Sequence, residues 1–157
     1  MTAKLQPQNP IGTSLYDRDI VAWANEQARL LREGRLDRLD IEHIAEEIED
    51  VGKSEQRELA SRMAVLIAHL IKWAYQPERR GSSWQRTIRT QRHAIALRIK
   101  RTPSLKPMLH DAGWQEEIWS DAVIGAIGEG TLEDLPQTCP WTMTQVLDPD
   151  WLPPSAP

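Results

Sequence analysis

The sequence predicts an all-α fold, a single-domain helical bundle of about five helices with a mostly irregular C-terminal segment. Apolar residues recur at spacings of three and four, and no stretch alternates as a strand does. With 157 residues, 40% of them hydrophobic and 27% charged, the chain can bury one full core. We expect a flexible lead over residues 1–13, a bundle over 14–130, and an irregular segment over 131–157 that packs on the bundle.

Two helices are expected in the first third of the chain. Ser14 can cap the first, which Gly34 would end because glycine readily enters the left-handed conformation. Its predicted face is Ile20, Trp23, Ala24, Gln27, Leu30 and Leu31. Asp37 or Asp40 can cap the second, whose apolar stripe (Ile41, Ile44, Ile48 and Val51) is of the kind that faces a core. Gly52 leaves open whether this helix continues into the next.

The third helix, ending near Tyr75, is predicted to be the central one. From Met63 to Ile71 it is apolar nearly all round, as a buried helix is. Pro77 ends it, since the residue before a proline is disfavoured in helical conformation. Ser82 or Ser83 can cap a fourth, basic helix, whose inner edge would be Trp84, Ile88, Gln91, Ile95 and Ile99.

A fifth helix is expected to start at a Ser104 cap. Pro107 fits its first turn, where the missing N–H costs no hydrogen bond. The apolar pattern then runs to Ala126 and dissolves over 125–130. Further on, Thr142 and Gln145 form a capping-box pattern that opens one helical turn.

Charge is strongly segregated although the net charge is only -4. Nine acids lie between Asp37 and Glu58, and nine bases lie between Lys72 and Arg101. The simplest interpretation is that the basic helix packs between acidic neighbours and pairs with them. The alternative is a nucleic-acid surface on the basic helix 84–101 and the turn before it, in which bases and aromatic rings alternate. Its candidate ligand-binding residues are Trp73, Arg80, Trp84, Arg86, Arg89 and Arg92, with Arg79 beside them.

A second alternative is an acid/base or metal-dependent enzyme that uses the acidic helix 40–51. Glu46, Glu47 and His69 are its candidate catalytic residues, provided that they converge on one pocket. His43, Glu46 and Glu47 could share one helical face and form a weak metal site. No metal or cofactor is expected, because no Glu-x-x-His or Cys-based ligand pattern occurs.

The cysteine content and the hydropathy of the sequence indicate a cellular compartment but no activity. Cys139 is the only cysteine, so no internal disulfide can form and a reducing, cytoplasmic compartment is expected. We expect its thiol to be structural. No window approaches the roughly 18 apolar residues of a membrane span.

The ordered motifs resemble the bacterial domain-of-unknown-function family 29, which is abundant in cyanobacteria. The resembling segments span residues 15–152 and include Leu39-Asp40, Glu46-Glu47-Ile48-Glu49, Gly52-Lys53-Ser54-Glu55, His69-Leu70-Ile71-Lys72-Trp73, Ser83-Trp84, Gln91-Arg92, Pro103-Ser104-Leu105 and Cys139-Pro140-Trp141. The resemblance implies a small all-helical protein, with no established activity to carry over. His43 lies outside the pattern, which weakens a metal site built on it.

The leading hypothesis is therefore a non-catalytic, cytoplasmic helical module that binds a partner protein or forms a homo-oligomer. Seven Trp in a chain without Phe, and the Gly-rich stretch 125–130, favour some apolar surface left for a partner.

Overall fold

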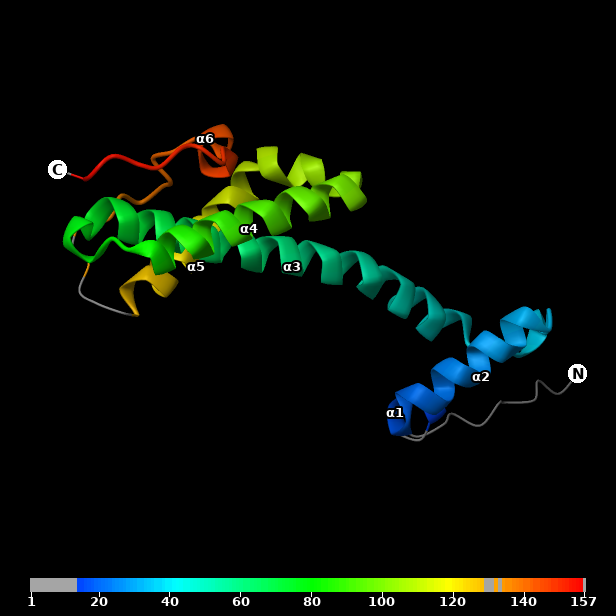
Figure 1. Cartoon of the computed structure of the whole chain (residues 1–157). Helices are drawn as coiled ribbons and strands as arrows, with labels where there is room; N and C mark the ends of the chain where they lie inside the picture. The colour runs from blue at the N-terminus through cyan, green and yellow to red at the C-terminus, as the bar shows by residue number, and fades with distance from the viewer. Residues whose placement is uncertain (1–13, 129–131, 133, 157) are drawn as a thin grey trace, which may run out of the picture. The chain divides into compact units, whose positions relative to one another are not determined.

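The structure, a computed structural model that describes residues 14–128, 132 and 134–156, is all-α as predicted (Figure 1). Its α-helices are α1 (Leu15–Arg18), α2 (Ile20–Arg32), α3 (Ile41–Tyr75), α4 (Ser82–Arg101), α5 (Ala112–Ile127) and α6 (Met143–Leu147). Three 3-10 helices connect them, η1 (Leu36–Arg38), η2 (Pro77–Arg79) and η3 (Pro103–His110). None of the described residues forms a strand. The expected flexible lead, 1–13, lies outside the described residues.

The chain divides into two compact units, an N-terminal unit up to Lys53 and a C-terminal unit from Ser54. The boundary falls within α3, which contributes residues to both. Gly52 is an interior residue of this helix. The two helices that the sequence left open as one or two are therefore a single continuous helix.

In the N-terminal unit, polar caps set where the first helices start. The Asp17 N–H donates to Ser14 Oγ over 3.1 Å, and the Ala22 N–H donates to Asp19 Oδ1 over 2.9 Å. The predicted first helix is therefore split into α1 and α2 at Asp19. Gly34 has φ +68° just after α2, so the predicted glycine stop is confirmed.

The predicted orientation of the second apolar stripe is wrong. Ile41, Ile48 and Val51 are 68%, 66% and 68% exposed. The residues of α3 that contact α1 and α2 are instead His43 and Glu47. Periodicity identified the residues that share a face, but in this unit polar and aromatic contacts decide which face packs.

The C-terminal unit is built around the second half of α3, as the sequence predicted. Figure 1 shows α4, α5 and α6 gathered along it. The residues buried in this core are Leu59, Met63, Leu66, Ile67, Ala68, Leu70 and Ile71 of α3, Ile88 and Ile95 of α4, Leu105 and Leu109 of η3, Ile118, Trp119, Ala122 and Ala126 of α5, and Val146 of α6. Trp84, expected on the inner edge of α4, is only half-buried and lies outside this core.

The predicted fifth helix is two elements. Residues 103–110 form the 3-10 helix η3, which holds Pro107 in its interior, and α5 starts only at Ala112. Asp111 caps α5, with its Oδ1 accepting from the Trp114 N–H over 2.7 Å. The capping box at Thr142 is confirmed and opens α6.

The chain after α6 runs along the C-terminal unit. Pro153 is buried, and the Ala156 N–H donates to the Ala74 carbonyl over 2.9 Å. Trp141 contacts Trp119 and Trp151 edge to face, with ring centroids 6.1 and 5.9 Å apart. Within the part of the chain that the structure describes, no helix has the length and apolar content needed to cross a membrane.

Candidate functional site

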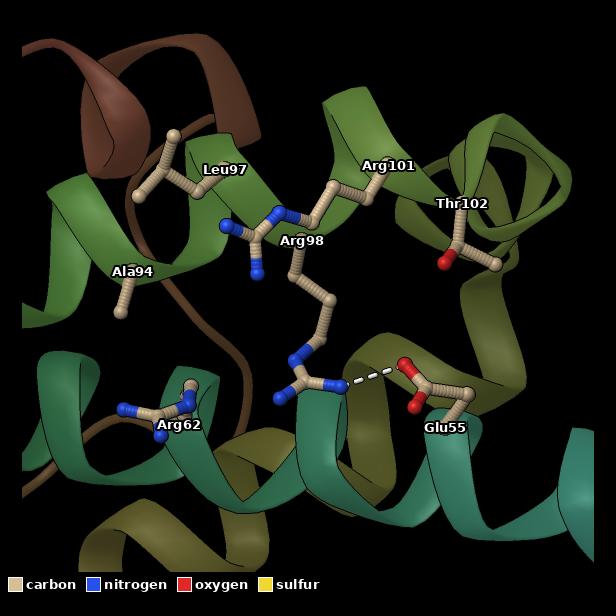
Figure 2. Close-up of a pocket in the computed structure, with 7 residues that line it drawn as sticks. All are labelled: Glu55, Arg62, Ala94, Leu97, Arg98, Arg101 and Thr102. Atoms are coloured by element: carbon tan, nitrogen blue, oxygen red, sulfur yellow. Dashed lines mark hydrogen bonds and ion pairs between the residues drawn. The ribbon is translucent and has the colours of Figure 1, made fainter.

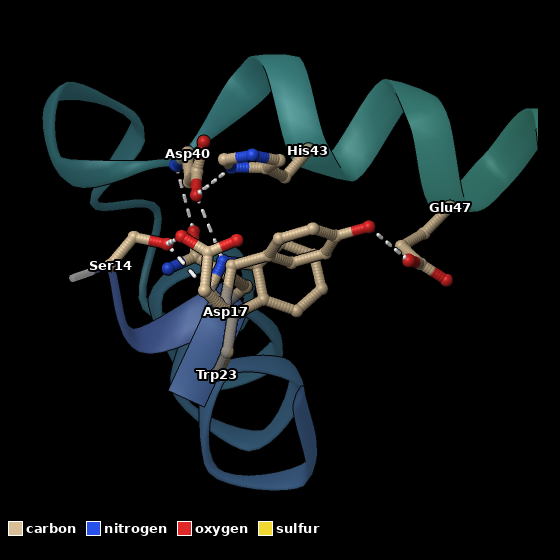
Figure 3. Close-up of polar contacts among 8 residues, drawn as sticks. Ser14, Asp17, Trp23, Asp40, His43 and Glu47 are labelled. Atoms are coloured by element: carbon tan, nitrogen blue, oxygen red, sulfur yellow. Dashed lines mark hydrogen bonds and ion pairs between the residues drawn. The ribbon is translucent and has the colours of Figure 1, made fainter. Parts of the chain in front are cut away.

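A polar cluster ties α1 and α2 to the first turns of α3 (Figure 3). Asp40 is its centre, with Oδ2 accepting from Trp23 Nε1 over 3.0 Å and lying 2.7 Å from His43 Nδ1. The Asp40 N–H donates to Gln27 Oε1 over 2.8 Å. Trp23 and Gln27 are 5% and 7% exposed. The buried face of α2 therefore holds the start of α3 through hydrogen bonds rather than through a broad apolar contact.

Tyr16 adds the second half of this cluster. Its ring stacks on His43 with centroids 3.9 Å apart, and it meets Trp23 edge to face at 4.9 Å. Its hydroxyl donates to Glu47 Oε1 over 2.6 Å. This hydrogen bond to a carboxylate, with partial burial, raises the pKa of Tyr16 to about 12. Tyr16 therefore stays protonated near neutral pH and acts as a donor.

Asp40 and His43 shift each other's pKa in opposite directions. Burial favours a higher pKa for Asp40, but the hydrogen bonds from His43 and Trp23 outweigh it, and the pKa is lowered. The hydrogen bond to Asp40 raises the pKa of His43, against the opposing effect of burial. The Asp40 contribution to stability is thus lost as pH falls through its lowered pKa. The His43 contribution is present below the ordinary histidine pKa near 6.5 and is lost as pH rises through the raised one.

We therefore expect the N-terminal unit to loosen as pH rises above the ordinary histidine pKa of about 6.5, when His43 loses its proton and its charge-assisted bond to Asp40. The protection factor of the Trp23 indole N–H against hydrogen exchange, followed by NMR, should fall as pH rises above this value. In His43→Gln the protection factor should not change with pH. A protection factor independent of pH in the unsubstituted protein would contradict the assigned pair.

The candidate catalytic residues are placed in different surroundings. Glu46 is exposed, and Glu47 accepts from Tyr16. His69 lies about six turns further along α3, in the C-terminal unit, where its Nδ1 is 2.8 Å from the Val65 carbonyl oxygen. Both acids and His69 thus belong to α3, the glutamates in the N-terminal unit and the histidine in the C-terminal unit. His43 is engaged by Asp40 and Tyr16, and no three metal-ligating side chains come together among the described residues.

Several candidates for a nucleic-acid surface are held by the protein itself. Arg80 donates from Nε to the Trp73 carbonyl over 2.7 Å and from Nη2 to Ser155 Oγ over 2.9 Å. Its guanidinium also lies over the Trp73 ring, 5.1 Å from the centroid. Arg92 is buried, at 6% exposed. Of this set, Arg86 and Arg89 remain exposed, as does the neighbouring Arg79.

Ion pairs between α3 and α4 account for part of the charge segregation (Figure 2). Arg98 pairs with Glu55, and its Nη2 is 3.6 Å from Glu58. Arg62 Nε lies 2.8 Å from Glu58, and Arg62 Nη1 donates to Gln91 over 3.3 Å. Glu55, Arg62 and Arg98 border a hollow of about 350 Å³. The predicted pairing of basic and acidic helices thus involves the last acids of the acidic run, and the acids from Glu42 to Asp50 belong to the other unit.

The apolar stripe on α3 (Ile41, half-buried Ile44, Ile48 and Val51) is the surface that the sequence identified without predicting its exposure. Glu42, Glu46, Glu49 and Asp50 are exposed, and at about 100° per residue they fall on the opposite side of the same helical turns. Lys53 follows the stripe, and its Nζ lies 3.5 Å from Glu49 and 3.9 Å from Asp50. The stripe is thus an apolar face on a helical segment that is acidic on its other side.

The model of the family described as domain of unknown function DUF29 matches residues 15–152. No curated protein and no solved structure shows significant similarity to the chain.

Proposed function

We propose that this chain, which belongs to the domain of unknown function family DUF29, is a non-catalytic cytoplasmic module that binds a partner protein through the apolar stripe on α3. The exposure of Ile41, Ile48 and Val51 is the observation that carries the proposal. Three large apolar side chains aligned on one helix and two-thirds exposed are typical of a protein-interaction surface.

The small core of the N-terminal unit supports this function. Among its described residues, the buried hydrophobic side chains are Trp23 and Leu30 alone. Its exposed large apolar side chains are Ile20, Val21, Leu31, Leu36, Ile41, Ile48 and Val51. Units of this size rarely reach full stability from their own core. A partner that covers the stripe would supply the missing apolar burial.

The charges around the stripe favour a basic amphipathic helix as the partner. From Asp37 to Lys53 there are seven acids and two bases. A second copy that paired through the same stripe would set acids against acids, which opposes association. A helix with an apolar face and flanking lysines or arginines would match both the stripe and the net negative charge of the segment that carries it. Self-association is the competing outcome that the experiment must detect.

The two other functions have less support. The acid/base enzyme has less support because Glu46 and Glu47 belong to the N-terminal unit and His69 belongs to the C-terminal unit. For a nucleic-acid surface, Arg80 and Arg92 are already engaged by carbonyl groups of the chain. The exposed arginines Arg86 and Arg89 keep that function testable by salt-dependent binding of single-stranded DNA.

The stripe can be tested with substitutions that leave the charge unchanged. The probe is a synthetic amphipathic helix with leucines on one face and lysines beside them, labelled for fluorescence anisotropy. Burying an apolar side chain that is two-thirds exposed contributes roughly 1–2 kcal/mol. We therefore expect Ile48→Gln or Val51→Gln to weaken binding about tenfold each. Thermal unfolding should change little, because both positions are exposed.

Two controls make this test specific. Ile124→Gln replaces an isoleucine of α5 that is 71% exposed and lies in the C-terminal unit, and it should bind the peptide as the unsubstituted protein does. A peptide with the same leucines and glutamates in place of lysines should bind at least tenfold more weakly. If the stripe variants Ile48→Gln and Val51→Gln bind the lysine peptide as tightly as Ile124→Gln and the unsubstituted protein do, the stripe is not the binding site. A dimer in light scattering, lost in Ile48→Gln, would assign the stripe to self-association instead.

A further inference from the structure

We propose that the C-terminal unit holds a small-molecule site for an aliphatic carboxylate, in a pocket between α4, η3 and α6 that is lined by Arg92, Ile95, Ile99, Lys100, Lys106 and Leu147. This Arg92 pocket has a volume of about 400 Å³, which is within the range of small-molecule sites. The site is independent of the apolar stripe on α3, because all of its residues belong to the other unit.

Arg92 is the residue on which the site depends. It is 94% buried, since its exposed fraction is 6%. Its Nε donates to the Val146 carbonyl over 2.9 Å. Its Nη2 is also buried but has no hydrogen-bond partner among the described residues. A guanidinium stays protonated in proteins, and leaving part of it buried without an acceptor is costly.

An anion in the pocket would supply the missing acceptor. A guanidinium presents its N–H groups in a planar fork, which suits the two oxygens of a carboxylate. Lys100 and Lys106 line the same pocket and are exposed, so they add positive charge at its edge. Among the described residues, none of the side chains that line this pocket is acidic. Burial lowers the pKa of Arg92, and the negative charge of Asp148 partly offsets this effect.

The apolar residues of the pocket identify the rest of the ligand. Ile95 is buried, and Ile99 and Leu147 are half-buried beside it. A simple inorganic anion would leave these side chains without a partner. A hydrocarbon chain that carries a terminal carboxylate would satisfy both the arginine and the aliphatic wall. The pocket therefore fits a medium-chain fatty acid better than a phosphate or a sugar.

Octanoate is the probe, and binding to the full chain is measured by isothermal titration calorimetry. We expect saturable binding of one octanoate per chain. Acetate, which has the charge without the chain, and 1-octanol, which has the chain without the charge, should each bind at least about tenfold more weakly. Equal affinity for octanoate and 1-octanol, or no octanoate binding, would overturn the proposal.

Substitutions of residues in and beside the Arg92 pocket test whether octanoate binds there. Lys100→Gln with Lys106→Gln changes two exposed side chains and should weaken octanoate binding several-fold, with a smaller salt dependence. Ala96→Trp, at an exposed position of the lining, should block the pocket without disturbing the core. Asp148→Asn should tighten binding, because it removes a negative charge that competes for Arg92. Unchanged binding in Ala96→Trp would place octanoate elsewhere and overturn the site.

Arg92 itself is tested by Arg92→Lys, which keeps the charge and loses the planar fork. We expect about a tenfold to hundredfold loss of octanoate affinity. If this variant does not fold, Ala96→Trp and Asp148→Asn decide the question, since both positions are exposed.

Discussion

Replacing Leu66 with Ala is expected to lower the free energy of unfolding of the C-terminal unit by about 2–5 kcal/mol. Leu66 is fully buried, and it lies in the second half of α3 among the core residues Met63, Ile67 and Leu70. Its truncation removes apolar burial and leaves a cavity that close-packed neighbours fill only in part. Urea denaturation followed by circular dichroism measures the loss.

Val65→Ala is the matched control for this substitution. Val65 is the preceding residue of the same helix and is 37% exposed. Val65→Ala should lower the free energy of unfolding by less than about 1 kcal/mol, because truncating a surface side chain removes little packing. Similar losses in the two variants would mean that α3 does not face the core as described.

Replacing Trp23 with Ala is expected to unfold the N-terminal unit while the C-terminal unit stays folded. Large aromatic truncations in a core cost about 3–5 kcal/mol. Here Trp23 is one of the two buried hydrophobic side chains of the unit's described residues, and its Nε1 is a hydrogen-bond donor to Asp40. Little core would remain to hold α1 and α2 on α3.

Hydrogen–deuterium exchange by mass spectrometry distinguishes local from global unfolding. In Trp23→Ala, peptides from residues 15–38 should exchange much faster, and peptides from 59–75 should keep their protection. Val21→Ala, at a position 66% exposed, should leave both regions unchanged. Loss of protection over 59–75 in Trp23→Ala would contradict two separately cooperative units.

Local signals in the sequence predicted where most helices start and stop. Gly34 and the capping box at Thr142 were identified correctly because each acts through its own backbone conformation or hydrogen bonds. The central part of α3 was predicted because it is apolar nearly all round, which allows only a buried position. These features depend on few neighbours, so the sequence alone is sufficient.

Features that depend on tertiary contacts were missed. The stripe at Ile41, Ile48 and Val51 has the spacing of a core-facing helix, but spacing does not say whether another element covers it. Asp40 contacts Trp23, which is 17 positions away in the sequence, and His43, which is 3 positions away. Only the contact with Trp23 depends on the tertiary fold. That Glu46, Glu47 and His69 belong to one helix was not evident from the sequence, because Gly52 left the continuity of α3 open. Arg92 was predicted to be a surface base because helical spacing placed it on the basic outer face with Arg86 and Arg89.

The most direct test of the proposed interaction is NMR of the ¹⁵N-labelled chain titrated with the lysine-flanked amphipathic peptide. We expect saturable amide shifts over residues 36–53, centred on Ile48, and the same residues should not respond to the glutamate-flanked peptide. Shifts confined to α4, or no shifts at a peptide excess, would contradict the claim that the exposed stripe of α3 is the interaction surface.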